Sequence, residues 1–363
     1  MIIFGSPRRY LQGPGAIARL GEEVAKLGKR AVLVADDHVT RLIGESADEG
    51  CRAAGVTLTT VRFGGEITRA EVDRLEAASW EGRPEVVIAA GGGKTIDAGK
   101  SLSGRLGARL VTVPTIASND SPTSHIIVVY DENHKLVGVD RLAANPDLVL
   151  VDTAIIARAP AKLLSAGIGD ALVKQFEVEQ CFRKGGTNMF GGRSPLTALA
   201  LARACYATIR ADSVAALAAV GRGEADEALE RVVEASVLMS GLSFESGGLS
   251  ICHAMTRGLS AVKGPAEALH GLQVAYGLLV QLELEGRERS FLDDMRGFFR
   301  AAGLPVSLAE LGFAGGGAEI ALIAELTAGA PHMKHFERQL APVEIVAAIE
   351  AVETRAKARE AAE

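Results

Sequence analysis

Val86-Val87-Ile88-Ala89-Ala90, followed at once by Gly91-Gly92-Gly93-Lys94-Thr95-Ile96-Asp97, is the stretch that decides the fold. The first part is a short apolar run rich in β-branched residues, which is typical of a strand covered on both faces. The second part is a glycine turn that opens a helix, so backbone N–H groups and the positive helix end face the space above the sheet. Glycine is needed because a Cβ would keep the backbone away from phosphate oxygens. The stretch therefore predicts a βα unit with a place for a pyrophosphate.

This turn lacks two phosphate-binding fingerprints. The dinucleotide pattern G-x-G-x-x-G is not matched, and the Walker A pattern would need glycine where Ile88 stands. An ATPase therefore loses its main support. A tight strand-to-helix turn without a ligand is the structural alternative.

Similar apolar runs alternate with helical patterns through the first half of the chain. The expected strands are residues 31–35, 56–63, 86–90, 110–113, 126–130 and 148–151. After about residue 155, β-branched runs become rare, and Ala, Leu, Glu and Arg dominate 196–220 and 225–238. The sequence predicts an α/β domain with a mainly parallel sheet over 1–155 and an all-α domain over 156–363, with a closing helix at 345–362.

The bulk composition excludes several classes of protein. The 363 residues are 48% apolar and 23% charged, which fits two globular domains, and the net charge of −6 without a basic run disfavours a nucleic-acid partner. Four irregularly spaced cysteines argue against a zinc ribbon or a disulfide framework and favour a reducing compartment. With no signal peptide and no apolar stretch of about 20 residues, we expect a cytoplasmic protein without a membrane partner.

Two further features suit a nucleotide cleft. Asp36 ends an early strand, where a carboxylate could bond ribose hydroxyls and repel the extra phosphate of NADP, or could merely cap the strand end. The polar cluster at 114–124 follows the strand ending at Val113 and could line the nicotinamide end. The same composition is also common in plain turns.

Asp170, His253 and His270 are the candidate metal ligands. All three lie in apolar, helix-forming surroundings, where an unpaired charge is costly, and one Asp with two His suits Zn²⁺ with open positions. The wide separation of the two histidines implies two helices or distant turns. A satisfied core histidine is the structural alternative. We rank His332 and His335 lower, because they follow a Gly-Ala-Pro break and suit an exposed loop or helix start.

Five ordered motifs carry a resemblance to a known family. They stand at 91–97, 114–120, 167–172, 244–249 and 270–271, and the match runs from about residue 5 to 350. Together they resemble the glycerol dehydrogenase family, within the iron-containing alcohol dehydrogenase and dehydroquinate synthase-like superfamily. The resemblance implies a dehydroquinate synthase-like fold, with an NAD-binding domain over 1–155, a helical metal- and substrate-binding domain over 156–363, and an active site in the cleft between them. It also implies a homo-oligomer.

The resemblance assigns roles residue by residue. Positions that hold NAD in the family correspond here to Asp36, Gly93, Lys94, Thr95, Asp97, Thr115, Ser118, Ser124, Ile126 and Tyr130. Asp120 matches the contact to a substrate hydroxyl, and Asp170, His253 and His270 match the ligands of Zn²⁺, at a site type that also takes iron. The implied reaction is NAD-dependent oxidation of a small polyol, glycerol to dihydroxyacetone, in which the metal stabilises an alkoxide as hydride passes to nicotinamide.

Departures from the family pattern keep alternatives open. Thr256 replaces a usual second histidine, Leu272-Gln273 replaces a usual Glu-Lys pair, and Lys174 stands one helical turn beyond Asp170. A cation near the metal could attract a phosphorylated substrate, although a solvated or salt-bridged lysine is the more ordinary interpretation. The alternatives are a glycerol-1-phosphate dehydrogenase, a dehydroquinate synthase-like lyase, and a catalytically silent nucleotide-binding or assembly protein.

Overall fold

The computed structural model describes residues 1–360 and divides into two compact units. The α/β unit comprises Gly5–Pro160 and Ala218–Gly241; the helical unit comprises Met1–Phe4, Ala161–Leu217 and the chain from Leu242 onward. The chain thus changes unit more often than the single boundary expected at 155/156. Residues 218–241 join the α/β unit because polar contacts tie them to its first strand: Gln12 Nε2 donates to Glu230 Oε2 at 2.6 Å.

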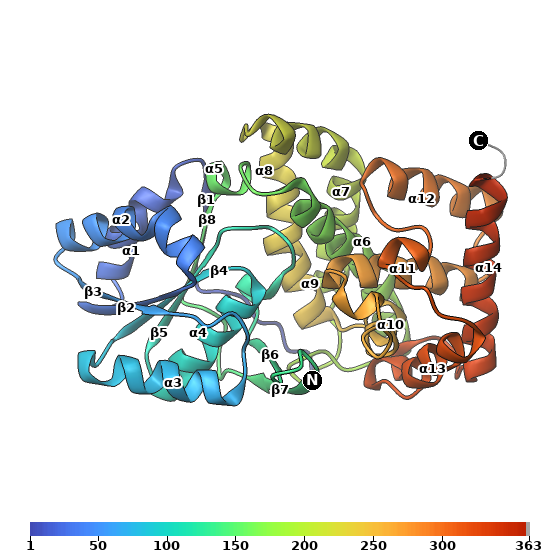
Figure 1. Cartoon of the computed structure of the whole chain (residues 1–363), viewed down its shortest axis with the longest axis horizontal. Coiled ribbons are helices and arrows are strands. Elements are labelled where there is room, and N and C mark those ends of the chain that lie inside the picture. The colour runs from blue at the N-terminus through green and yellow to red at the C-terminus, as the bar shows by residue number, and fades with distance from the viewer. Residues whose placement is uncertain (361–363) are drawn as a thin grey trace. The chain divides into compact units, whose positions relative to one another are not determined.

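Six parallel strands form the main sheet of the α/β unit, in the order β1-β8-β5-β4-β2-β3 (Figure 1). The strands are β1 (Tyr10–Gly13), β2 (Arg30–Ala35), β3 (Thr57–Arg62), β4 (Val86–Gly91), β5 (Arg109–Pro114) and β8 (Leu148–Asp152). The helices are η1 (Ala16–Arg19), α1 (Leu20–Ala25), α2 (Asp37–Ala53), α3 (Arg69–Ser79), η2 (Trp80–Gly82), α4 (Gly93–Leu106), η3 (Ser121–Thr123), α5 (Thr153–Ile156), α8 (Glu227–Val233) and the π-helical η4 (Glu234–Met239). The predicted mainly parallel α/β fold is confirmed.

Both faces of this sheet are buried, which explains the continuous apolar runs. Leu33 and Ile88 belong to a core that also holds Leu20 and Ile43 from α1 and α2. Their strand neighbours point the other way, because side chains alternate along a strand, and pack with residues of α3 and α4. A strand buried on both faces has no polar side, so its sequence lacks the alternation of a half-exposed strand.

One predicted strand belongs elsewhere. Residues 126–130 do form a strand, β6 (Ile126–Tyr130), but it pairs antiparallel with β7 (Leu136–Arg141) in a separate two-stranded sheet. The turn between them closes on Asp131, whose N–H donates to the Lys135 carbonyl. A chain that returns through so short a turn can only pair antiparallel, since parallel neighbours need a long crossover. The strand expected at 126–130 is therefore present, but it lies outside the parallel sheet.

The regular elements of the described chain after Pro160 are helices. They are α6 (Ala161–Lys184), α7 (Leu196–Arg222), α8, η4, α9 (Ser240–Gly247), α10 (Ile251–Leu259), η5 (Pro265–Glu267), α11 (His270–Leu284), α12 (Arg289–Ala301), η6 (Ala309–Leu311), α13 (Gly317–Ala328), η7 (Pro331–His335) and α14 (Pro342–Glu360). The end of the predicted closing helix, beyond Glu360, lies outside the described residues. Within residues 1–360, no helix combines the length and apolar character that crossing a bilayer requires.

Helices α6 and α11 approach each other through two glycines. A Cβ on Gly271 would lie 1.8 Å from the Ala166 carbonyl oxygen, and one on Gly169 would lie 2.5 Å from the Gly271 carbonyl oxygen. Both obstacles are backbone atoms, which cannot rotate away. Because each glycine is next to a candidate ligand, Asp170 or His270, this contact fixes the separation of those two side chains.

Replacing Gly271 by alanine is therefore expected to destabilise the protein by about 1–3 kcal/mol, the usual cost of overpacking a well-packed core. The matched control is Gly297→Ala at an exposed position of α12, where no atom lies within 4 Å of the added Cβ. There the change should be neutral or stabilising by up to about 1 kcal/mol. Urea unfolding of both variants measures the difference, and equal midpoints would contradict the close helix contact.

Candidate functional site

The glycine turn leaves the start of α4 open for an anion. Gly91 has φ +145°, and a Cβ there would lie 2.8 Å from Thr95 Oγ1; a Cβ on Gly93 would lie 2.6 Å from the Asn119 side-chain nitrogen. Gly92 caps the helix without a side-chain hydrogen bond. The first N–H groups of a 14-residue helix are thus not covered by a capping side chain. Such an end is suited to a phosphate group.

Asp36 lies at the same edge of the sheet as this turn. It directly follows β2, which pairs with β4 in parallel register, so the carboxyl ends of the two strands are neighbours. The chain leaves β2 toward β3 and later leaves β4 toward β5, which makes this the point where the strand order reverses. Ligands of open α/β sheets bind at such points. The Asp36 carboxylate also caps α2 by accepting from Val39 N at 2.8 Å, so the cap that the sequence left as an alternative is present.

Several predicted nucleotide contacts belong to a hydrogen-bond network around Lys100, which the sequence analysis missed. Lys100 is fully buried, and its Nζ lies 3.0 Å from Asp97 Oδ1, 3.2 Å from Ser124 Oγ and 2.8 Å from the Ile126 carbonyl oxygen. The other Asp97 oxygen accepts from Val128 N. In this structure these groups fix β6 and the preceding loop to α4. The signal was the Asp97-to-Lys100 spacing, which places both on one face of a helix.

Lys94 and Tyr130 lie together at the start of α4. The exposed Lys94 forms an ion pair with Glu66 at 2.5 Å, and its ammonium lies 5.3 Å from the centre of the Tyr130 ring. Burial, with Asp97 and Glu66 nearby, raises the pKa of Tyr130 to about 12, so this phenol stays neutral. Of the other predicted residues, Thr95 and Thr115 are buried, and Ser118 is half-buried.

Asp120, the candidate substrate contact, is buried and held by Ser240. The Ser240 hydroxyl donates to Asp120 Oδ2 at 2.7 Å. The loop that carries Asp120 packs closely there, because a Cβ on Gly241 would lie 1.8 Å from Thr123 Oγ1. The orientation of the Asp120 carboxylate is therefore fixed by residues of the α/β unit, to which Ser240 and Gly241 also belong.

In the helical unit, the structure brings the three predicted metal ligands together. Asp170 comes from α6, His253 from α10 and His270 from the first position of α11, and one possible ligand atom of each lies within 4.8 Å of the others. Two helices supply the histidines, as their separation in sequence predicted. The ring centres are 5.3 Å apart. One oxygen and two nitrogens this close together are a set of ligands that a single divalent ion could share.

Glu177 holds His253 in the orientation that a ligand needs. It is fully buried, and its Oε2 lies 2.5 Å from His253 Nδ1, while Oε1 accepts from the backbone N–H groups of Ser250 and His253. A hydrogen on Nδ1 leaves Nε2 to face the site, which is how a carboxylate commonly supports a metal-bound histidine. The sequence analysis missed Glu177, although its place seven residues after Asp170 puts both on one helix face.

The surroundings of the triad fit a cation. Asp170 Oδ2 is a buried carboxylate oxygen without a hydrogen-bond partner among the described residues, an arrangement that is costly unless a ligand completes it. Burial opposes ionisation of Asp170, but the neighbouring Lys174, His253 and His270 hold its pKa well below the usual range. Burial likewise lowers the pKa of His253, yet Glu177 outweighs it and raises that pKa. The buried carboxylates of Asp170 and Glu177 would also attract a metal ion.

His270 is the neutral member of the triad. Desolvation by the surrounding protein lowers its pKa to about 4, with the nearby His253 and Lys174 acting in the same direction and Asp170 opposing them, although the residue as a whole is exposed. A neutral imidazole is the form that binds metal ions.

Lys174 is salt-bridged rather than solvated. Its Nζ lies 2.5 Å from Asp170 Oδ1, and both side chains are 1% exposed.

His335, which was expected to lie in an exposed loop or helix start, is buried in the structure. Its Nδ1 bonds the Leu249 carbonyl at 2.7 Å and holds η7 in place. The half-buried His332 has its pKa lowered to about 4, chiefly by burial and also by His253.

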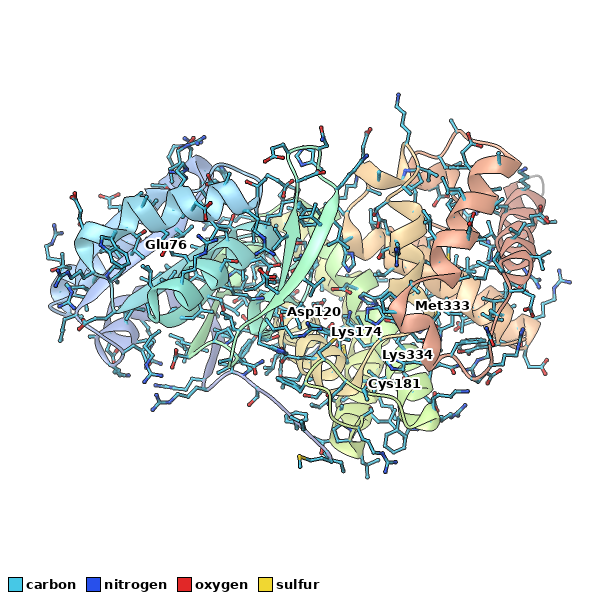
Figure 2. The ribbon with its side chains drawn as sticks, turned by 90° about the horizontal axis from the view of Figure 1, so that it is seen from below. Glu76, Asp120, Lys174, Cys181, Met333 and Lys334 are labelled. Carbon is cyan, nitrogen blue, oxygen red and sulfur yellow. The ribbon has the colours of Figure 1, made fainter. Side chains whose placement is uncertain are left out.

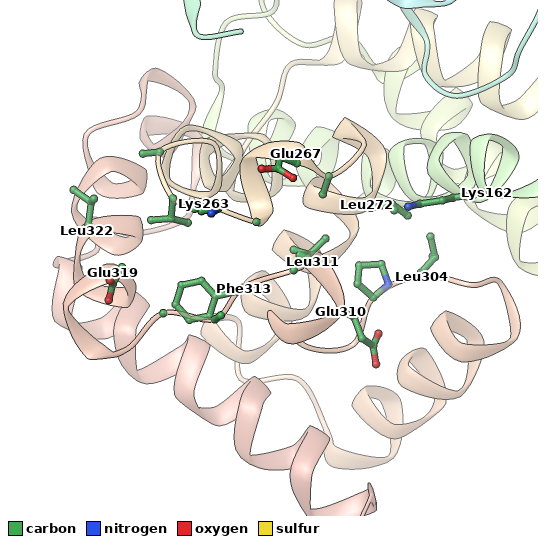
Figure 3. Close-up of a pocket in the computed structure, with 18 of the residues that line it drawn as sticks. Lys162, Lys263, Glu267, Leu272, Leu304, Glu310, Leu311, Phe313, Glu319 and Leu322 are labelled. Atoms are coloured by element: carbon green, nitrogen blue, oxygen red, sulfur yellow. The ribbon is translucent and has the colours of Figure 1, made fainter. Parts of the chain in front are cut away.

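A cavity of the helical unit lies apart from the triad. Its volume is about 1170 Å³, and its lining includes Lys162, Lys263, Arg300, Glu267 and Glu310 (Figure 3). None of the three ligands lines it. Its mixture of charges selects no class of ligand, so we assign the chemistry to the triad and the glycine turn.

A family model, related sequences and solved structures all match this chain to one group of enzymes. Residues 7–153 match the family described as iron-containing alcohol dehydrogenase. A glycerol dehydrogenase of Thermotoga maritima is 43% identical over 310 residues, which cover 85% of this chain and 84% of that protein. A glycolaldehyde reductase of Halobacterium salinarum is 37% identical, with 85% of each chain covered. The crystal structure of glycerol dehydrogenase from Schizosaccharomyces pombe is similar with a TM-score of 0.93 at 34% identity, covering 98% of this chain and 91% of that one. The chain therefore belongs to the glycerol dehydrogenase family of the iron-containing alcohol dehydrogenases.

Proposed function

We propose that the protein is an NAD- and metal-dependent dehydrogenase of small polyols that oxidises glycerol to dihydroxyacetone. The observation that carries this proposal is the triad of Asp170, His253 and His270, with its unpartnered Asp170 oxygen, in a chain whose relatives include glycerol dehydrogenases. In this reaction one hydride leaves the carbinol carbon for nicotinamide, and the hydroxyl loses a proton.

The three side chains would hold a divalent ion, either zinc or iron. When bound, the ion supplies a Lewis acid that lowers the pKa of the substrate's hydroxyl. Glu177, through its contact with Nδ1, would keep His253 Nε2 available as a ligand atom, and the low pKa of His270 would keep that ring neutral at neutral pH. Asp120, fixed by Ser240, would accept a hydrogen bond from a substrate hydroxyl and orient it.

The α/β unit would hold the dinucleotide. The glycine turn and the first N–H groups of α4 would receive the pyrophosphate, and Asp36 would accept hydrogen bonds from the adenosine ribose. Lys94, Thr95, Thr115, Ser118 and Tyr130 would complete the site, while Asp97, Ser124 and Ile126 would act through the Lys100 network that fixes their loop.

A second candidate is the reduction of glycolaldehyde, which is favoured by the similarity to a glycolaldehyde reductase. It uses the same site with hydride passing in the opposite direction. The phosphorylated-substrate alternative loses support, because Lys174 is engaged with Asp170. The expected homo-oligomer stays a prediction that sedimentation would test.

The metal requirement is testable with the purified protein. NAD⁺ reduction with glycerol should fall at least about 100-fold on chelation and return when Zn²⁺ or Fe²⁺ is added, because no other group at the site supplies a divalent charge. Asp170→Asn should not be restored by metal, while NADH fluorescence should show unchanged cofactor binding. A metal-loaded, folded protein that is inert on glycerol but reduces glycolaldehyde would favour the second candidate.

Asp36 is expected to set the preference for NAD over NADP. Asp36→Ser keeps a side chain that can cap α2 but removes the charge, so the ratio of kcat/KM for NAD⁺ to that for NADP⁺ should fall about 10-fold or more. Asp37→Ser, the control, removes a carboxylate that pairs with Arg62 on the exposed side. An unchanged ratio in the Asp36 variant would place the ribose elsewhere.

A further inference from the structure

Lys174 is a fully buried lysine inside the candidate metal site. It lies on α6 one helical turn after Asp170 and three residues before Glu177, so all three charged groups share one buried helix face. Figure 2 labels Lys174 and, farther along the same helix, Cys181. Burial of an ammonium is unfavourable unless the group is paired, whereas a lysine on an exposed helix surface loses no hydration. The burial of Lys174 beside the triad is therefore not explained by helix packing alone.

The ammonium contacts the atoms that a metal ion would use. Lys174 Nζ lies 2.5 Å from Asp170 Oδ1 and 3.3 Å from His253 Nε2. An ammonium has donors only, so its contact with the imidazole uses the Nε2 lone pair, the pair that would also bind a metal. The ring of Phe244, 5.5 Å from Nζ, adds a favourable π face.

The ammonium covers only part of the ligand set. Asp170 Oδ2, the second oxygen of that carboxylate, has no hydrogen-bond partner among the described residues. Asp170 and Glu177 place buried negative charge on the helix face that also carries Lys174. A divalent ion at the triad would be attracted by that charge, but it would meet the lysine's positive charge at short range.

We propose that Lys174 is an internal cation that competes with the metal ion for Asp170 and His253. In the metal-free protein it holds these two ligands in position and compensates the Asp170 charge. Binding of an ion by these two ligands would require the ammonium to leave both atoms, which the flexible lysine chain permits without loss of its charge. Metal binding is therefore weaker than the same triad would allow without the lysine, which makes occupancy of the site depend on the concentration of free metal. This inference rests on the metal-dependent function proposed above.

The test is the affinity of the full-length protein for Zn²⁺, measured by competition with a chromophoric chelator. Lys174→Met, which keeps most of the unbranched apolar chain but removes the ammonium, should lower the Kd for Zn²⁺ about 10- to 100-fold. Lys174→Gln should shift the Kd in the same direction. The matched control is Lys162→Met, which removes a lysine from the first turn of the same helix, where it lines the separate cavity, and should leave the Kd unchanged.

A stability measurement provides a second readout. Without metal, both Lys174 variants should melt at a lower temperature than the unaltered protein, because Asp170 loses its paired charge. Saturating Zn²⁺ should then raise their melting temperature by more than it raises that of the unaltered protein. A variant with equal or weaker Zn²⁺ affinity would overturn the proposal, as would an unaltered protein that binds no Zn²⁺ and oxidises glycerol without it.

The Asp170→Asn variant distinguishes a failure of this inference from a failure of the proposed function on which it rests. If Asp170→Asn abolishes Zn²⁺ binding while Lys174→Met leaves the affinity unchanged, the triad is the metal site and only the competition is disproved. If Asp170→Asn binds Zn²⁺ as tightly as the unaltered protein does, the triad is not the metal site and the proposed function fails with it.

Discussion

The close contact between α6 and α11 is the constraint on which the candidate metal site depends. Gly169 and Gly271 let the two helix backbones approach to a distance that no side chain would permit. Each glycine is followed or preceded by a ligand, so the backbone contact sets the spacing of Asp170 and His270 directly. Both glycines, one in the Gly-Asp pair and one in the His-Gly pair, are therefore needed for the same helix contact. A substitution that moves the two helices apart would also change the distance between the two ligands.

Features that follow from the local sequence pattern were predicted, whereas features that depend on which distant segments pack together were missed. The strands of the parallel sheet were recognisable because burial on both faces leaves an uninterrupted apolar run, as at Val86–Gly91. The pairing partner of Ile126–Tyr130 was not predicted, because the residues of a strand do not specify which neighbour it pairs with. That neighbour, Leu136–Arg141, was not recognised as a strand, and most of its residues are exposed in the structure.

The site residues divide in the same way. The histidines and Asp170 were identifiable because each stands beside a distinctive motif, and the structure brings them within reach of one ion. Glu177 and Lys100 were missed because a charged residue in a helical stretch normally faces solvent. Only the packing of other helices and loops around them makes these two positions buried, and that information lies far away in the sequence.

Two buried lysines show how similar spacing can serve different ends. Lys100 and Asp97 in the α/β unit form a closed network: both Asp97 oxygens accept hydrogen bonds, and the lysine also contacts Ser121, Ser124 and the Ile126 carbonyl. Lys174 and Asp170 also stand one helical turn apart, yet one Asp170 oxygen is left without a partner. Complete hydrogen bonding of a buried pair stabilises one arrangement, whereas an oxygen without a partner beside two histidines leaves a position that a further cation would stabilise.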